Sequence, residues 1–240
     1  MKRIQEALNE KILILDGPMG TMIQNENLKE EDYRGKKFES TSIPLKGNND
    51  ILNLTQEKII YDIHTKYLAA GADIIETNTF NSTKTSQLDY KCEDFSYDLN
   101  FSGGKIARKA VDDFLTKNPK EMKYVAGVLG PTNRTCSMSP DVNNPGFRNI
   151  SFDELYSDYE KSSEALIEAG VDVIMVETVF DTLNAKAALS GIGGACKKSK
   201  KNVPIMISAT ITDLSGRTLS GQTIEAFYNS ILHVDPLSVG

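Results

Sequence analysis

The segment DVIMVET at residues 172–178 joins a run of four apolar residues to a polar end. The same pattern recurs four more times, at residues 12–17, 73–78, 124–130 and 204–210. Near-continuous apolar runs of this length are typical of strands buried on both faces, as in a parallel sheet covered by helices. Since α/β folds place their chemistry at the carboxyl ends of such strands, the polar ends mark the expected site.

Amphipathic segments lie between these strands and predict helices. Residues 59–68 carry apolar side chains on one helical face, with Thr55 as the expected N-cap. Ser151 and Glu154 have the spacing of a capping box, and Asp181 is the expected cap of a helix over 182–196. The resulting β-α-β-α order predicts either a (β/α)8 barrel or a doubly wound open sheet. Five strands are clear, and residues 236–240 begin a possible sixth.

Two features interrupt this regular order. Residues 24–50 form a polar insertion, which is usually a functional loop or a surface decoration. The segments that begin AGAD at residue 70 and AGVD at residue 169 are similar, and aligning their glycines gives Asn78 and Glu177 the same offset. Both side chains are therefore expected on one face of the sheet. Glu76 ends a similar apolar run and is a weaker candidate than Glu177, because its opposite parity favours the helix layer.

Composition excludes several classes of protein. The chain has 240 residues, 33 acidic and 27 basic side chains, and a net charge of −6, so it has no charge pattern for binding nucleic acid. Its three cysteines include no Cys-x-x-Cys pair, which favours free thiols in a cytoplasmic protein. No signal peptide and no apolar segment of about 20 residues is present, so no membrane partner is expected.

The polar strand ends contain two candidate binding elements. Asp16 opens the turn DGPMGT at residues 16–21, whose glycines allow backbone N–H groups to approach an anion. The turn can equally be an ordinary connection in which Asp16 caps the next helix. Glu177 ends an apolar strand, where an unpaired carboxylate is unfavourable, so it needs a cation from the protein or from a ligand. His64 and His233 have no spacing partner for a metal and are expected to be structural or solvated.

Taken together, the loops resemble the homocysteine-binding module of cobalamin-dependent methionine synthase. The resemblance runs from about residue 12 to residue 240 and depends on the segments at residues 16–24, 45–52, 71–80, 130–133, 177–182 and 215–222. It implies one homocysteine-binding (β/α)8 TIM-type barrel domain over residues 1–240, with 24–50 as an inserted loop region. About five to six of the eight βα units are present, so the barrel is expected to be incomplete at its C-terminal side.

The resemblance also implies roles for particular residues. Backbone donors of the turn after Asp16 are expected to bind the carboxylate of homocysteine, and Glu177 with Asp16 its ammonium. The expected substrate-binding residues are Asp16, Gly17, Met19, Gly20, Thr21, Asn78 and Glu177. Zinc is expected to activate the thiol, methylcobalamin to donate the methyl group, and folate- and cobalamin-binding modules to be partners in the same full-length protein.

The cysteines do not match the zinc ligands of this family, which are three cysteines near the ends of the sixth and last strands. Cys92, Cys136 and Cys196 stand in other contexts, so we assign no catalytic or metal-binding residue here. The zinc ligands are expected beyond Gly240, and residues 1–240 alone are expected to be inactive.

The sequence therefore predicts part of a methyltransferase that converts homocysteine to methionine. Two alternatives stay open. One is a homocysteine S-methyltransferase that uses betaine or S-methylmethionine. The other is a barrel that binds a ligand without catalysis.

Overall fold

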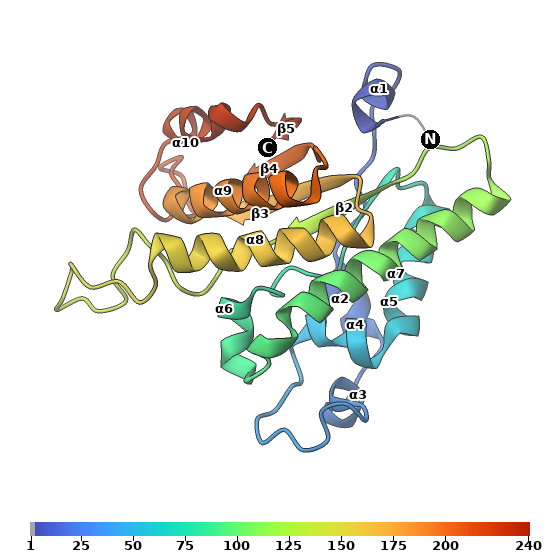
Figure 1. The fold of residues 1–240 in the computed structure, drawn as a ribbon, viewed down its shortest axis with the longest axis horizontal. Helices are drawn as coiled ribbons and strands as arrows, with labels where there is room; N and C mark the ends of the chain where they lie inside the picture. Colours follow the sequence, from blue (N-terminus) through green and yellow to red (C-terminus); the bar gives the residue numbers. More distant parts are fainter. Residues whose placement is uncertain (1–2) are drawn as a thin grey trace.

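A computed structural model describes residues 3–240, which form an α/β fold around a five-stranded sheet (Figure 1). The strands follow the order β1-β2-β3-β4-β5 and every neighbouring pair is parallel. This order confirms the predicted parallel α/β fold, whereas closure into a (β/α)8 barrel stays a prediction.

The strands are β1 (Ile74–Glu76), β2 (Tyr124–Leu129), β3 (Val173–Val179), β4 (Ile205–Ala209) and β5 (Ser238–Val239). The α-helices are α1 (Ile4–Leu8), α2 (Met19–Asn25), α3 (Glu30–Arg34), α4 (Leu52–Thr55), α5 (Glu57–Ala70), α6 (Lys84–Gln87), α7 (Ser96–Lys117), α8 (Phe152–Ala169), α9 (Thr182–Ser199) and α10 (Ile224–Ile231). Short 3-10 helices are η1 (Asn49–Ile51), η2 (Leu88–Tyr90), η3 (Glu93–Phe95) and η4 (Leu232–Val234).

Four of the five predicted strands form, and the possible sixth is confirmed as β5. The first run is an exception, because residues 12–15 make only one isolated parallel bridge, between Leu15 and Ile74. Ile12 and Ile14 are 90% and 59% exposed, whereas Leu13 and Leu15 are half-buried against the cluster that contains Ile74. With one neighbouring strand and only one side buried, the apolar run does not extend into a regular ladder.

Successive side chains along each strand lie on opposite faces of the sheet. On one face, Ile75, Val125 and Ile174 pack with residues of α5, α7, α8 and α9. Figure 1 shows α8 and α9 lying side by side along this face. On the other face, which we call the inner face, Ile74 and Val173 form the inner cluster with Tyr124, Met175 and residues of α1. Both faces are therefore buried, as the apolar runs predicted.

The predicted helix caps have different outcomes. The Ser151–Glu154 capping box is confirmed at the start of α8, and the Asp181 side chain accepts hydrogen bonds from the first turn of α9. The prediction for Thr55 is wrong. Thr55 ends α4, and its hydroxyl donates to the Ile51 carbonyl at 3.3 Å, whereas Gln56 is the N-cap of α5. A bond back to the preceding turn uses the group that a cap would need.

The insertion at residues 24–50 has its own apolar anchor. Tyr33, Phe38 and Leu45 are buried in a cluster with residues of α5 and α7. This packing fixes the segment that follows, residues 47–50, beside the carboxyl end of β1. The insertion is thus part of the structure around the site.

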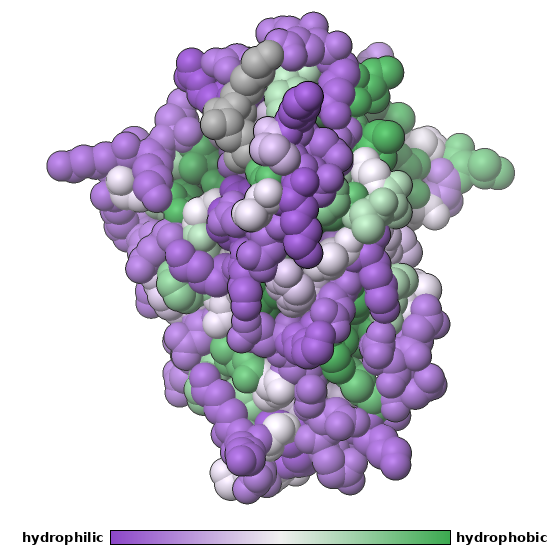
Figure 2. Space-filling view, turned by 90° about the vertical axis from the view of Figure 1, so that its right-hand side faces the viewer, coloured by the Kyte–Doolittle hydropathy of each residue, from purple (hydrophilic) through white to green (hydrophobic). Residues whose placement is uncertain are grey.

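The face in Figure 2 is predominantly hydrophilic, with hydrophobic side chains visible in separate patches. Within residues 3–240, no helix combines the length and the apolar character that a membrane span requires.

Candidate functional site

Three carboxylates from separate strand ends lie close together at the carboxyl end of the sheet, and Glu76 and Glu177, but not Asp16, line one cavity there. Asp16 follows the first apolar run, Glu76 ends β1, and Glu177 lies near the end of β3. They are close enough for the charge of Glu177 to act on both Asp16 and Glu76. Glu76 and Glu177 line a cavity of about 350 Å³, which is within the usual size of a small-molecule site.

The position of Glu76 corrects the sequence analysis, which assigned it to the helix layer. Glu76 is two residues from Ile74, whose side chain belongs to the inner cluster, and alternation gives both residues the same face. Its offset from Gly71 and that of Asn78 are both odd, so the opposite parity assumed for it was wrong. The sequence signal that identifies Glu76 was present and was misinterpreted.

Burial makes ionisation of this group of acids unfavourable. It raises the pKa of Asp16 to about 7, with a further increase from the charge of Glu177, although the hydrogen bond from the Glu76 N–H acts in the other direction. Burial and the charges of Glu177 and Asp16 raise the pKa of Glu76 to about 8. Burial also raises the pKa of Glu177. Among the described residues, no lysine or arginine forms an ion pair with any of the three.

The turn after Asp16 places backbone donors beside these acids. Asp16 Oδ2 accepts the Glu76 N–H at 3.1 Å, and the N-cap of α2 is Pro18, so Asp16 does not cap this helix. Within residues 3–240, the N–H groups of Gly17, Met19 and Gly20 have no hydrogen-bond acceptor. A Cβ on Gly17 would lie 3.0 Å from Tyr67 Cε1, so a larger residue would push against this ring.

The other candidates differ in how they meet the cavity. Gly17, Met19, Gly20 and Asn78 line it. Thr21 is exposed in α2 and is not among the lining residues. The Asn78 amide nitrogen donates to Asn49 O at 2.8 Å and to Asn53 Oδ1 at 3.1 Å. Its role visible in the structure is to connect the segment after β1 to the end of the insertion and to α4.

Sequence analysis missed the contribution of the insertion to the cavity. Gly47, Asn49 and Asp50 line it. Asp50 is 3% exposed and accepts from the Asn81 N–H and the Ser82 hydroxyl, both at 2.8 Å. Burial raises the pKa of Asp50 to about 6, with these hydrogen bonds opposing the increase. The asparagine-rich end of the insertion was the available signal, but no pairing rule connects it to β1.

The family of the chain follows from a match over nearly all of its length. The family model described as homocysteine S-methyltransferase matches residues 13–240. The chain belongs to the homocysteine S-methyltransferase family.

Solved structures with a similar fold include three forms of the homocysteine methyltransferase MmuM from Escherichia coli. The metallated form is 20% identical, with a TM-score of 0.75 over 98% of this chain and 76% of MmuM. The oxidized form is also 20% identical, with a TM-score of 0.74 over 97% and 74%. The apo form is 19% identical, with a TM-score of 0.68 over 97% and 73%. At this identity the likeness concerns the fold.

The cysteines were tested against the zinc site that the family resemblance implies. Cys92 is buried in the cluster under the insertion, Cys136 follows β2, and Cys196 lies in α9. In the part of the chain that the structure describes, no three His, Cys, Asp or Glu side chains are grouped so that they could hold a metal ion. The described residues therefore do not fit a zinc ion.

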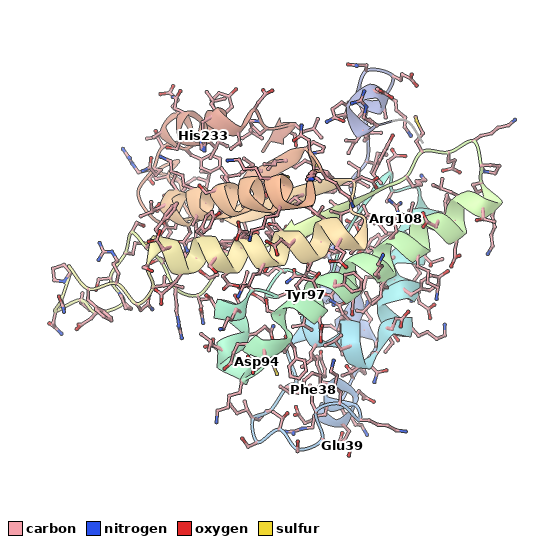
Figure 3. The ribbon with its side chains drawn as sticks, in the orientation of Figure 1. Phe38, Glu39, Asp94, Tyr97, Arg108 and His233 are labelled. Atoms are coloured by element: carbon pink, nitrogen blue, oxygen red, sulfur yellow. The ribbon has the colours of Figure 1, made fainter. Side chains whose placement is uncertain are left out.

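Neither histidine belongs to the site. His64 is fully buried in α5, and its ring nitrogens have no hydrogen-bond partner among the described residues. His233 is exposed in η4, near α10 (Figure 3). Both placements agree with the structural and solvated roles predicted for them.

A larger cavity, of about 640 Å³, lies away from the three acids. Asp94 and Tyr97, both labelled in Figure 3, line it together with Arg134 and Asp158. Its polar groups are partly used inside the protein, because Asp158 accepts the N–H groups of Lys84 and Thr85 at 2.7 Å. The mixture of both charges indicates no particular ligand, so the smaller, acidic cavity is the better candidate.

Proposed function

We propose that this chain binds homocysteine in the acidic cavity, as the substrate of a methyl transfer to sulfur. The observation that carries the proposal is the group Asp16, Glu76 and Glu177, which is largely buried and has no cation from the described protein. The family description names homocysteine, and its ammonium is the cation that we propose for this group.

Homocysteine carries both of its charged groups on one carbon atom. Its ammonium fits the carboxylates of Glu177 and Asp16, with Glu76 as an additional neighbour, because a cation favours the ionised form of each acid. Its carboxylate fits the unused N–H groups of Gly17, Met19 and Gly20. Anchoring this end leaves the thiol, at the other end of the molecule, available for reaction.

For the methyl donor, we propose methylcobalamin carried on another module of the same protein. The support is the resemblance of the segments around Asn78, Asn133 and Arg217 to cobalamin-dependent methionine synthase. Betaine and S-methylmethionine are the alternative donors. Supplying each donor in turn with homocysteine to the full-length protein and measuring methionine discriminates among them, and turnover with S-methylmethionine alone would reject cobalamin.

Calorimetry of the full-length protein with L-homocysteine tests the binding role of Glu177. We expect Glu177→Gln to weaken binding by at least about tenfold, because the variant loses a partly buried charge pair with the ammonium. The matched control is Glu225→Gln, which changes an exposed glutamate of α10 and is expected to bind like wild type. Equal affinity of Glu177→Gln and wild type would reject the proposed contact.

A further inference from the structure

An irregularity in β3 lies directly at Glu177. Val176 pairs with Ile207 of β4, and Val179 pairs with Ala209, so the register shifts between these two points. Three steps along β3 therefore correspond to two steps along β4. Glu177 and Thr178 together oppose the single residue Ser208, which is the arrangement of a β-bulge.

The backbone of Thr178 has an unusual conformation. Its φ angle is +59°, in the left-handed region, although threonine is β-branched. Such residues rarely adopt positive φ because the side chain crowds the backbone. Backbone strain of this kind persists where the surrounding structure enforces it, and it often accompanies a functional site.

The extra residue changes which face of the sheet the end of β3 presents. Val173 and Met175 belong to the inner cluster, and regular alternation would place Glu177 and then Val179 on the same inner face. Val179 instead packs with Val176 in the core on the helix side. The bulge thus keeps Glu177 at the cavity and removes the next apolar side chain from beside it.

Ser208 holds the bulge through its side chain. The Thr178 N–H donates to Ser208 Oγ at 3.3 Å, so a hydroxyl replaces the carbonyl that would accept in a regular ladder. Beyond the bulge, the Thr210 N–H donates to the Val179 carbonyl at 2.9 Å and regular pairing resumes. The distortion is confined to the two residues opposite Ser208.

We propose that Thr178 and Ser208 are positioning residues, which orient Glu177 toward the ammonium of the substrate and keep Val179 out of the cavity. This inference rests on the proposed function for the identity of the ligand. It assigns neither residue a contact with substrate, because both act through Glu177.

The test is a double-mutant cycle measured by L-homocysteine calorimetry. Ser208→Ala removes the acceptor of the Thr178 N–H, and we expect about fivefold weaker binding from the loss of one hydrogen bond. Ser208→Thr keeps the hydroxyl and is expected to restore most of the affinity. In a Glu177→Gln background, Ser208→Ala is expected to have no further effect, because the residue through which it acts is already changed. Ser230→Ala, which removes a half-buried hydroxyl of α10, is the control.

A second measurement needs no ligand. Carbon NMR titration of the Glu177 carboxyl is expected to give a pKa in Ser208→Ala that differs from wild type by at least about 0.5. Equal affinity of Ser208→Ala and wild type, an equal loss in both backgrounds, or an unchanged Glu177 pKa would each overturn the positioning role. Failure of the wild-type protein to bind homocysteine would instead overturn the proposed function. The titration would still test whether Ser208 positions the Glu177 carboxyl.

Discussion

Carboxylates at the two ends of the sheet differ in whether they are paired with cations. At the amino ends of the strands, Asp73 and Asp172 are paired with basic side chains. At the carboxyl ends, Asp16, Glu76 and Glu177 face one another, and no described cation pairs with them. The same protein therefore neutralises one set of acids and leaves another set without a partner.

Asp73 shows how completely the amino end is satisfied. Its carboxylate accepts from Lys11 Nζ at 2.8 Å, from the Ile14 N–H at 3.1 Å and from Lys123 Nζ at 3.3 Å. Burial alone would raise the pKa of Asp73, but the hydrogen bonds and both lysine charges hold it below its ordinary value. These contacts join three separate segments of the chain beneath the sheet.

Asp172 occupies the equivalent position before β3. It accepts from Arg108 of α7 at 2.8 Å and from the Val125 N–H at 2.8 Å. Both aspartates follow the repeated Ala-Gly segments, so the internal similarity of the sequence marks paired, structural acids. The unpaired acids lie at the other end of the same strands, where α/β folds bind ligands. The contrast supports the proposal that a ligand supplies the cation at the carboxyl end.

The largest expected effect comes from removing an ion pair at the amino ends of the strands. Asp73→Asn removes the charge that compensates Lys123, whose side chain is only 3% exposed, and leaves Glu121 as its other acidic partner. We expect the free energy of unfolding to fall by about 3 kcal/mol, as is usual when one member of a buried pair is removed. Urea denaturation followed by circular dichroism measures this change.

The control for this prediction is an exposed pair of the same type. Asp62 binds Lys58 at 2.7 Å on the surface of α5, with side chains that are 44% and 84% exposed. Asp62→Asn is expected to change stability by less than about 0.5 kcal/mol. If Asp73→Asn lowered the free energy of unfolding as little as Asp62→Asn, the paired acids at the amino ends of the strands would not stabilise the fold.

The next effect concerns the pH dependence of binding at the carboxyl end. Asp16 and Glu76, with pKa values of about 7 and 8, are partly protonated at neutral pH, whereas an ammonium binds their ionised forms. We therefore expect the affinity for L-homocysteine to increase by about tenfold from pH 6 to pH 8, with release of protons on binding. Calorimetry in buffers of different ionisation enthalpy measures both quantities, and proton uptake would contradict the ammonium role.

Much of this arrangement could be predicted from local sequence. The apolar runs at residues 124–130, 172–178 and 204–210 became strands because burial on two faces demands near-continuous apolar side chains. The capping box at Ser151 depends on residues three apart, so its prediction was also reliable. Glu177 was identified because a carboxylate at the end of a buried run needs a partner.

Other features depend on contacts that no local pattern records. The pairing of Asp73 with Lys11 joins residues far apart in the chain, as does the hydrogen bond between Asn78 and Asn49. The bulge at Thr178 interrupts the alternation that predicts which face of the sheet each side chain occupies. The composition of the strand does not predict this bulge. The first run makes only an isolated bridge to Ile74, because a regular ladder depends on burial as well as on an apolar sequence.

The smallest expected effect separates function from stability at a single residue. The pKa of Glu76 is raised from its ordinary value of 4.5 to about 8 in the folded protein, so the folded state binds the proton more tightly. Its contribution to stability is fully present below pH 4.5 and is lost as the pH rises through 8. Glu76→Gln removes that loss, and we expect the free energy of unfolding to rise by about 0.5–2 kcal/mol at pH 8, as for other sites where function opposes stability.

The same variant is expected to bind homocysteine more weakly, because one neighbouring charge is gone. Thermal unfolding at pH 5 and pH 8, together with calorimetry, measures the two changes. A Glu76→Gln variant that is less stable than wild type at pH 8 would show that this acid is paired in solution, and the contrast between the two ends of the sheet would not hold at Glu76.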